Sequence, residues 1–313
     1  MNYSEQKEWK EIEQYLPEKL HFTKDYQPIE KWWDWKGHKV HLDCFPNQNA
    51  KVKVILLHGV GTNGRQMSMI LGGPLSKDGI ETIAIDMPTY GLTEVQKGTL
   101  VKYDDWVDLA SDYIDYELQC DDRPILLYGL SAGGMETYHI ATKNKKVKGI
   151  IGMTFLDQKD QQVRDETARN IFMSRVGIPM AGVACKIGLG GFKLKMSIAS
   201  KMSTLCNDER VMKVFSRDKT SAGNKASMKF LSRYSNYQPA MEPEDFDVCP
   251  ILLTQPDQDR WTPLHLSTPF LNRIKKVDVK IVVLENGGHY PVEQPALDQM
   301  HDAILEFIHK VIQ

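Results

Sequence analysis

The sequence predicts an α/β fold in which a mostly parallel central sheet is flanked by helices and carries an inserted helical cap. Two observations support this prediction. Short apolar runs alternate with helical patterns up to residue 156 and again from residue 246, as in sheets whose parallel strands are joined by covering helices. Between them, residues 157–245 show no convincing strand, only helix-like segments rich in methionine. We therefore assign 1–156 and 246–313 to two parts of one core and 157–245 to the cap.

The first part of the core begins with an expected hairpin and then alternates strand and helix. Tryptophans and aliphatic residues alternate on either side of Lys36-Gly37, and we interpret these tryptophans as packing groups. Among the helices, 104–119 has the clearest apolar face, and Asp104 or Asp105 is placed to cap its start. The expected strands are 51–57, 80–85, 125–128 and 147–155, and the expected helices are 65–77, 104–119 and 135–142.

The cap differs from the core in charge as well as in pattern. Its 15 lysines and arginines against 10 aspartates and glutamates give a balance of +5, which we interpret as a solvated surface. After the cap the alternation returns, with expected strands at 250–254 and 280–284 and expected helices at 264–275 and 295–311. In such a sheet the functional loops are expected at the carboxyl ends of the strands.

Composition and charge argue against several classes of function. At 313 residues, with a net charge of -2 and a pI near 6.5, the chain has no basic field suited to nucleic acid. Five scattered cysteines without metal-ligand spacing are expected to be free thiols, and no metal site is expected. The N-terminus has no apolar signal segment and 176–192 is too short for a transmembrane span, so we expect a cytoplasmic protein. The oligomeric state is left open.

A candidate nucleophile lies where the apolar run 124–128 meets a helical pattern. The junction reads Gly129-Leu130-Ser131-Ala132-Gly133, a Gly-x-Ser-x-Gly sequence. A sharp turn between strand and helix needs small residues on either side of the serine, and it exposes the hydroxyl at a helix N-terminus. We therefore interpret this junction as a nucleophile elbow.

A serine hydroxyl needs a base, a group that orients the base, and donors for the oxyanion. His289 follows a late strand and two glycines, and it is the only histidine in such a loop. Asp259 lies past the end of the preceding strand and is placed to orient the imidazole, with Asp257 as a rival. The backbone amides of Val60 and Ala132 are the expected oxyanion donors because both follow strand ends beside Ser131.

With these features in order, the chain resembles α/β-hydrolase-fold serine hydrolases of the capped esterase and lysophospholipase-like type. The resemblance covers most of the chain except the first 30 or so residues and the cap. One departure is Thr89, which stands where the family commonly has glycine after the proline of the Asp86 turn. The motifs that carry the resemblance are His58-Gly59, Asp86-x-Pro88, Gly129-x-Ser131-x-Gly133, Asp259-x-x-x-Pro263 and Gly288-His289.

The resemblance implies a role for each member of a triad. Ser131 matches the family's nucleophile and His289 its general base. Asp259 matches the acid, because the family's turn has the form Asp-x-x-x-Pro, and Asp257 then matches a supporting position. No metal or organic cofactor is implied.

We therefore expect a serine hydrolase that cleaves a small-molecule carboxylic ester through an acyl-enzyme. The apolar, methionine-rich cap favours a medium or long acyl chain. Trp261, beside Asp259, and Arg65, near the start of a helix, are candidate substrate-binding residues, with Arg65 placed for a substrate carboxylate. The same triad serves acyltransferases, thioesterases, aminopeptidases and carbon-carbon hydrolases, and a ligand-binding protein on this scaffold is a further alternative.

Overall fold

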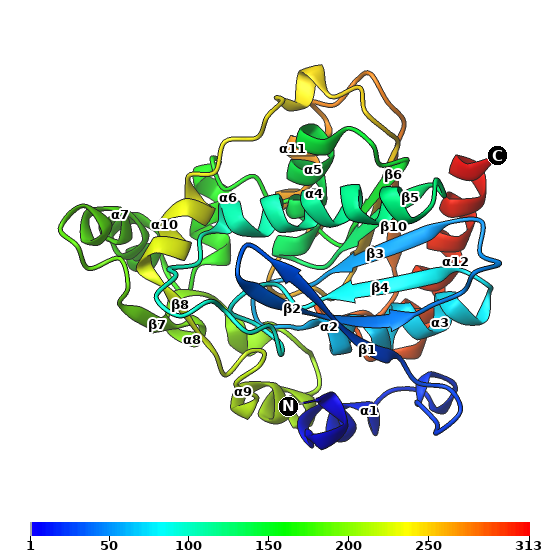
Figure 1. Cartoon of the computed structure of the whole chain (residues 1–313). Helices are drawn as coiled ribbons and strands as arrows, with labels where there is room; N and C mark the ends of the chain where they lie inside the picture. Colours follow the sequence, from blue (N-terminus) through cyan, green and yellow to red (C-terminus); the bar gives the residue numbers. More distant parts are fainter. Residues whose placement is uncertain (1) are drawn as a thin grey trace.

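Eight strands form the central sheet of the computed structural model, which describes residues 2–313 (Figure 1). In the order in which they pair, they are β1 (Ile29–Trp35), β2 (His38–Phe45), β4 (Glu81–Ile85), β3 (Lys53–Leu57), β5 (Ile125–Gly129), β6 (Gly149–Gly152), β9 (Ile251–Pro256) and β10 (Val279–Leu284). β1 and β2 are antiparallel to each other, β2 is antiparallel to β4, and the six strands from β4 to β10 are parallel. The predicted fold class is confirmed.

The centre of the sheet is formed by the most apolar runs of the sequence. Every residue of β3 and β5 is buried, as expected for parallel strands that are covered on both faces. At the edges, β1 and β10 each leave several side chains exposed. The opening hairpin turns at Lys36 and Gly37, which both have positive φ, as two-residue hairpin turns require.

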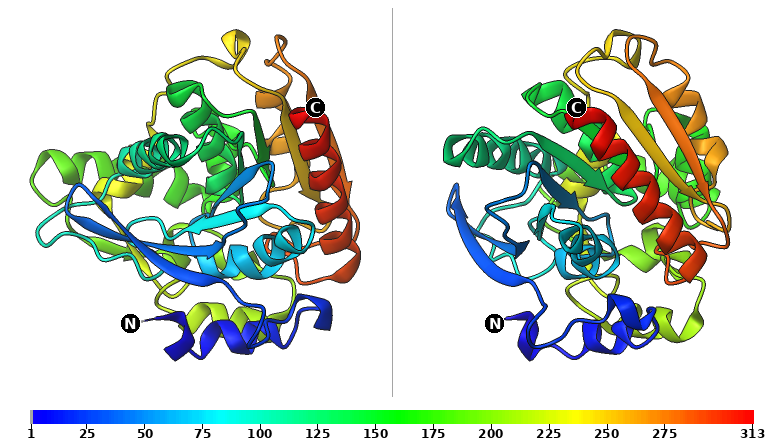
Figure 2. Two further views of the ribbon diagram at one scale, coloured as in Figure 1. Left: turned by 45° about the vertical axis from the view of Figure 1, so that its right-hand side comes forward. Right: turned by 90° about the vertical axis from the view of Figure 1, so that its right-hand side faces the viewer.

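The order of the strands determines which face each helix covers. The chain moves one way along the sheet from β3 to β4, and the opposite way from β4 to β5 and from β5 to β6. Because such crossovers are right-handed, the helices after β3 lie on one face and those after β4 and β5 on the other. Accordingly, α4 (Tyr103–Cys120) packs on α5 (Ala132–Asn144), and the C-terminal helix α12 (Gln294–Ile312) packs on α3 (Gly73–Lys77) across the sheet from them (Figure 2).

The core helices agree with the predicted ranges except at two places. The predicted helix 65–77 is divided by a wide π-helical turn at 68–72, and the predicted helix 264–275 is reduced to two short turns. Pro269 explains the second difference, because it lacks the N–H that an uninterrupted helix needs at that position. The core helices are α1 (Glu8–Glu13), α2 (Gly64–Met67), α3 (Gly73–Lys77), α4 (Tyr103–Cys120), α5 (Ala132–Asn144), α11 (Thr268–Leu271) and α12 (Gln294–Ile312).

The segment between β6 and β9 forms the cap. It also contains two strands of three residues, β7 (Lys193–Lys195) and β8 (Lys225–Ser227), which pair with each other and not with the central sheet. The expectation that this segment holds no strand was therefore wrong, since three residues are too few to show an alternating pattern. Its helices are α6 (Gln161–Thr167), α7 (Ile178–Lys186), α8 (Met196–Ala199), α9 (Glu209–Arg217) and α10 (Met228–Ser235).

Candidate active site

The loops that follow β3, β5, β9 and β10 carry the predicted site residues. These strands are parallel, so their carboxyl ends lie along one edge of the sheet. Ser131 follows β5, Asp259 follows β9 and His289 follows β10. Residues that are distant in sequence are thereby gathered at the edge over which the cap lies.

Ser131 lies on a sharp turn between β5 and α5. Its φ of 57° and ψ of -122° form a strained conformation for a residue with a side chain. The turn is tight enough that a Cβ at Gly129 would lie 2.0 Å from the carbonyl oxygen of Gly133. A Cβ at Gly133 would lie 2.6 Å from the carbonyl oxygen of Leu57. Gly129 is therefore required by the tightness of the turn itself, and Gly133 is required by the close packing of the turn against the end of β3.

His289 is held by a buried carboxylate and a buried hydroxyl. Its Nδ1 lies 2.8 Å from Oδ2 of Asp259 and 3.0 Å from Oγ1 of Thr262. Because the carboxylate accepts, Nδ1 carries a proton that it donates to Asp259. The other ring nitrogen, Nε2, is buried and has no hydrogen-bond partner among residues 2–313. Nε2 is thus left with a free lone pair.

Asp259 is stabilised as a carboxylate by four donors. Besides the imidazole, it accepts from the amides of Trp261 and Thr262, each at 2.8 Å, and from the Thr262 hydroxyl at 2.7 Å. Burial alone would raise the pKa of Asp259, but His289 and the other donors outweigh it and lower the pKa to about 2. The rival carboxylate, Asp257, is exposed. Asp259 is the carboxylate that the fold brings to His289.

The amides of Val60 and Ala132 are both free. Neither donates a hydrogen bond to another group of residues 2–313, and Ala132 is the first residue of α5, where no earlier helical carbonyl exists. The two loops are in close contact, since a Cβ at Gly59 would lie 2.7 Å from Cβ of Ser131. His58 holds the first loop in place: its Nε2 accepts from the Met87 amide at 2.9 Å, so its Nδ1 donates to the Gly59 carbonyl at 2.8 Å.

Ser131 opens into a cavity of about 70 Å³ between the core and the cap. Val60 and Ala132 line the cavity beside the serine, and Trp261 and Thr262 line it on the side of His289. The Trp261 ring lies 4.9 Å from the His289 ring, and its Nε1 donates to the Thr167 carbonyl of the cap at 3.0 Å. The remaining lining is mainly apolar and comes from the cap, including Ile178, Met196, Ala199, Phe230, Leu231 and Tyr234.

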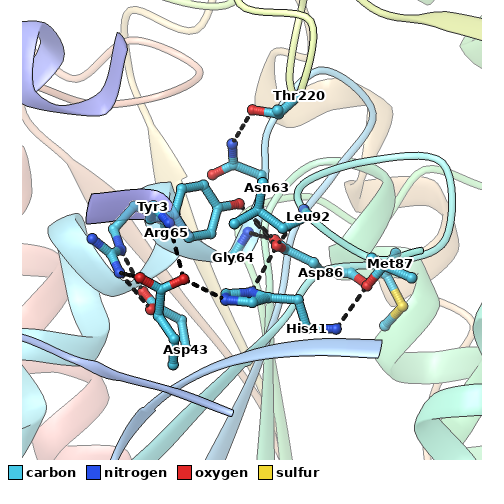
Figure 3. Close-up of polar contacts among 12 residues, drawn as sticks. Tyr3, His41, Asp43, Asn63, Gly64, Arg65, Asp86, Met87, Leu92 and Thr220 are labelled. Carbon is cyan, nitrogen blue, oxygen red and sulfur yellow. Dashed lines mark hydrogen bonds and ion pairs between the residues drawn. The ribbon is translucent and has the colours of Figure 1, made fainter. Parts of the chain in front are cut away.

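Arg65 is not a residue of this cavity, and the expectation that it meets a substrate carboxylate is not supported. Its guanidinium is buried and donates two hydrogen bonds of 2.8 Å to Asp43 of β2 (Figure 3). Its planar head also stacks on the rings of Tyr3 and Trp9, at 4.8 and 4.6 Å. Asp43 and the N-terminal aromatics therefore occupy the surfaces that an anionic ligand would need.

A second buried carboxylate, Asp86, ties the loop after β3 to its surroundings. It accepts from the Gly64 amide at 2.7 Å, from the Leu92 amide at 2.8 Å and from the Tyr3 hydroxyl at 2.9 Å (Figure 3). Nδ1 of His41 lies 2.9 Å from the same carboxylate. Burial would lower the pKa of His41, but Asp86 and the neighbouring acids raise it to about 9, so the pair is ionic at neutral pH. This network fixes the loop that presents Val60.

The structure places the predicted residues Ser131, Asp259 and His289 on loops at the same side of the sheet, but the sequence did not reveal the groups that support these loops. His41 and Tyr3 were not singled out, because their contacts with Asp86 join segments that are far apart in the chain. The Asp86-x-Pro88 motif was the one available signal, since a carboxylate directly after a buried strand suggests a role in fixing a loop. The cap residues that line the cavity had no signal beyond their apolar character.

Helix α5 also carries a buried carboxyl group that has no partner. Glu136 is fully buried, and neither of its side-chain oxygens has a hydrogen-bond partner among residues 2–313. Burial raises the pKa of Glu136 well above its usual range. Burial therefore favours the protonated form of this side chain in the folded protein, whereas the unfolded chain ionises it at neutral pH.

We expect Glu136→Gln to stabilise the protein at pH 7, because above the ordinary pKa of a glutamate the wild type must take up a proton on folding and the glutamine variant does not. The sign follows from the raised pKa: the stability of the wild type falls as pH rises above about 4.5, and the glutamine variant lacks this fall. Urea unfolding at pH 7 and pH 4 measures the difference, which should nearly vanish at pH 4. Glu285→Gln, at an exposed position, should change neither value. An equal effect of Glu136→Gln at both pH values would contradict this account.

Residues 54–298 match the family described as the alpha/beta hydrolase family. A soluble variant of monoglyceride lipase from Saccharomyces cerevisiae superposes with a TM-score of 0.74 at 14% identity, covering 94% of this chain and 98% of that one. Monoacylglycerol lipase from Paleococcus ferrophilus gives 0.66 at 20% identity, covering 86% and 98%. A carboxylesterase from Bacillus subtilis gives 0.62 at 14% identity, covering 96% of each chain. A search of the curated proteins finds no match.

Proposed function

This chain belongs to the alpha/beta hydrolase family, and from that premise we propose that it hydrolyses a carboxylic ester with Ser131, His289 and Asp259 as a catalytic triad. The observation that carries the proposal is the buried pair of His289 and Asp259, which is joined at 2.8 Å. Nε2 of His289 has no hydrogen-bond partner among residues 2–313, and Trp261 and Thr262, which contact this imidazole, line the same cavity as Ser131. An imidazole oriented by a carboxylate through Nδ1 has its Nε2 available as a base.

In the proposed reaction, the Ser131 oxygen attacks the ester carbonyl as its proton passes to Nε2 of His289. The carbonyl oxygen becomes an oxyanion, which the amides of Val60 and Ala132 stabilise. His289 then gives its proton to the leaving alkoxide, so an alcohol departs and an acyl-enzyme remains. Water then enters, loses a proton to His289 and attacks the acyl carbon. The bond between this carbon and the Ser131 oxygen breaks, His289 returns the proton to Ser131, and the acid is released.

The apolar lining of the cavity supports an acyl group with several methylenes. Ile178, Met196 and Phe230 contribute apolar walls, and no charged side chain lines the cavity among residues 2–313. Each methylene moved from water into such a site contributes about 0.8 kcal/mol. The monoglyceride lipases and the carboxylesterase among the structural neighbours are also named for ester substrates, which favours an ester over an amide.

We expect kcat/KM for p-nitrophenyl esters to rise roughly fourfold per methylene from acetyl upwards, and then to level off once the cavity is filled. Initial rates with the series from acetyl to palmitoyl measure this dependence. A fluorophosphonate should label the protein once, at Ser131, as shown by the mass of the labelled peptide. The absence of both turnover and labelling would overturn the proposal. An ester product formed with an added alcohol would indicate acyl transfer instead of hydrolysis.

A further inference from the structure

The cap exposes an unusually apolar surface. Of the 15 large apolar side chains that are exposed among residues 2–313, nine belong to the segment 171–198. Phe172, Phe192 and Ile187 are the most exposed of them, at 69, 63 and 66%. Single exposed apolar side chains are normal, but a cluster within one segment marks an interaction surface. We call the exposed apolar side chains of residues 171–198 the cap face.

Helix α7 shows how the cap face is built. Ala181 is buried where α7 packs on α10, whereas Met180 and Val183 are more than half exposed on other sides of the helix. Ile178, in the first turn of α7, lines the cavity beside Ser131. Figure 1 shows α7 at the end of the molecule that lies away from α12. The cap face is therefore the outer side of a wall whose inner side encloses the cavity.

The segment that carries the cap face contains charged residues of one sign only. Residues 169–201 contain six lysines and arginines and no aspartate or glutamate. Lys186, Lys193 and Lys195 are exposed and form no ion pair with any group of residues 2–313, whereas Arg175 pairs with Asp165 at 2.8 Å. Free lysines beside exposed aromatic and aliphatic side chains form the pattern of segments that lie on anionic membranes.

We propose that the cap face docks on an anionic lipid surface, with Phe172 and Phe192 reaching the boundary between headgroups and acyl chains, and with Lys193 and Lys195 against lipid phosphates. The match of charge selects this partner, because a second copy of the chain placed face to face would bring two sets of unpaired lysines together. The docking is peripheral, since no helix of residues 2–313 is both long and apolar enough to cross a bilayer. It does not depend on the ester chemistry proposed above.

Sedimentation with vesicles of phosphatidylcholine alone, or mixed with phosphatidylglycerol, tests the proposal with the whole chain. We expect binding to the mixed vesicles and weak binding to the neutral ones, with the binding reduced by added salt. Phe172→Ser with Phe192→Ser, and Lys193→Glu with Lys195→Glu, should each lower the partition coefficient by roughly tenfold or more. None of these four residues lines the cavity, so hydrolysis of a short soluble ester should be retained.

Matched pairs elsewhere on the surface serve as controls. Ile281→Ser with Val283→Ser removes two exposed apolar side chains from β10. Lys51→Glu with Lys148→Glu reverses two exposed lysines that form no ion pair with any group of residues 2–313 and that precede β3 and β6, at the opposite edge of the sheet. Both control pairs should bind the mixed vesicles like the wild type, and all variants should keep its unfolding temperature.

Three outcomes would overturn the proposal. One is that the wild type binds neither kind of vesicle. Another is that it binds neutral and anionic vesicles equally and without dependence on salt. The third is that light scattering shows a dimer that the cap-face substitutions dissociate, which would make a second copy the partner. Lipid and salt dependence are measured on the wild type, so they decide the matter even where a variant fails to fold.

Discussion

Replacing Ser131 with alanine is expected to lower kcat/KM for p-nitrophenyl butyrate by at least about a thousandfold. The alanine retains the cavity and the free amides of Val60 and Ala132, but it removes the oxygen that forms the acyl-enzyme. Any residual rate must then come from attack by water, assisted only by the oxyanion donors. Initial rates at saturating and subsaturating ester separate the loss in kcat from any change in KM.

Ser235→Ala is a matched control, because Ser235 is a buried serine that lines the same cavity. It should keep most of the wild-type rate and should still be labelled by a fluorophosphonate. If Ser131→Ala were as active as the wild type, Ser131 would not be the nucleophile. A loss of activity together with a large fall in the unfolding temperature would instead indicate damage to the strained turn. Ser131→Thr would then also have a lowered unfolding temperature.

The sequence was sufficient to predict the parallel part of the sheet and the loops at its carboxyl ends. β3 and β5 are continuous apolar runs, so their burial on both faces is visible in composition alone. The turn at Ser131 could also be predicted, because the packing of Gly129 against Gly133 leaves no room for a side chain and the sequence therefore shows glycine at both positions. In each case the sequence signal lies within a few residues of the feature that it predicts.

Contacts between residues that are far apart in the chain could not be predicted from the sequence. Arg65 lies near the start of a helix after the loop that carries Val60, a place suited to binding an anion, and nothing local reveals that Asp43 takes up its charge. The partner comes from a strand on the far side of β4, and the stacked ring of Tyr3 comes from the chain's first turn. For the cap, the sequence predicted helices but not which side chains line the cavity. The residues that line the cavity and those that face solvent are both apolar.

The cap face changes the interpretation of the cap's positive charge. Composition alone favoured a solvated surface, because charged residues usually serve solubility. The structure places the free lysines next to Phe192 and other exposed apolar side chains, which solvation does not explain. Charge and apolar surface must be considered together, and only the fold shows which apolar side chains of the segment are exposed beside the lysines.

The second large effect is expected from the carboxylate of Asp259, which the structure places against His289 in preference to the nearby Asp257. Asp259→Asn is expected to lower kcat by roughly ten-thousandfold at neutral pH. His289 now donates through Nδ1 to Asp259, which leaves Nε2 as the base, and the pKa of about 2 keeps that carboxylate charged throughout the working range. An asparagine amide presents an N–H donor to Nδ1 of His289 and so favours the tautomer that carries its proton on Nε2. In that tautomer Nε2 has no lone pair with which to accept the proton of Ser131.

Asp257→Asn is the control for this prediction, since Asp257 lies two residues away, is exposed, and makes no contact with His289. Steady-state rates for the two variants on the same short ester give the comparison, and circular dichroism verifies that both remain folded. Asp257→Asn should stay within about twofold of the wild type, in line with most exposed substitutions. Equal losses in the two variants would mean that acidity near the loop matters more than the hydrogen bond to Nδ1. A loss confined to Asp257→Asn would transfer the role of the acid to the exposed carboxylate.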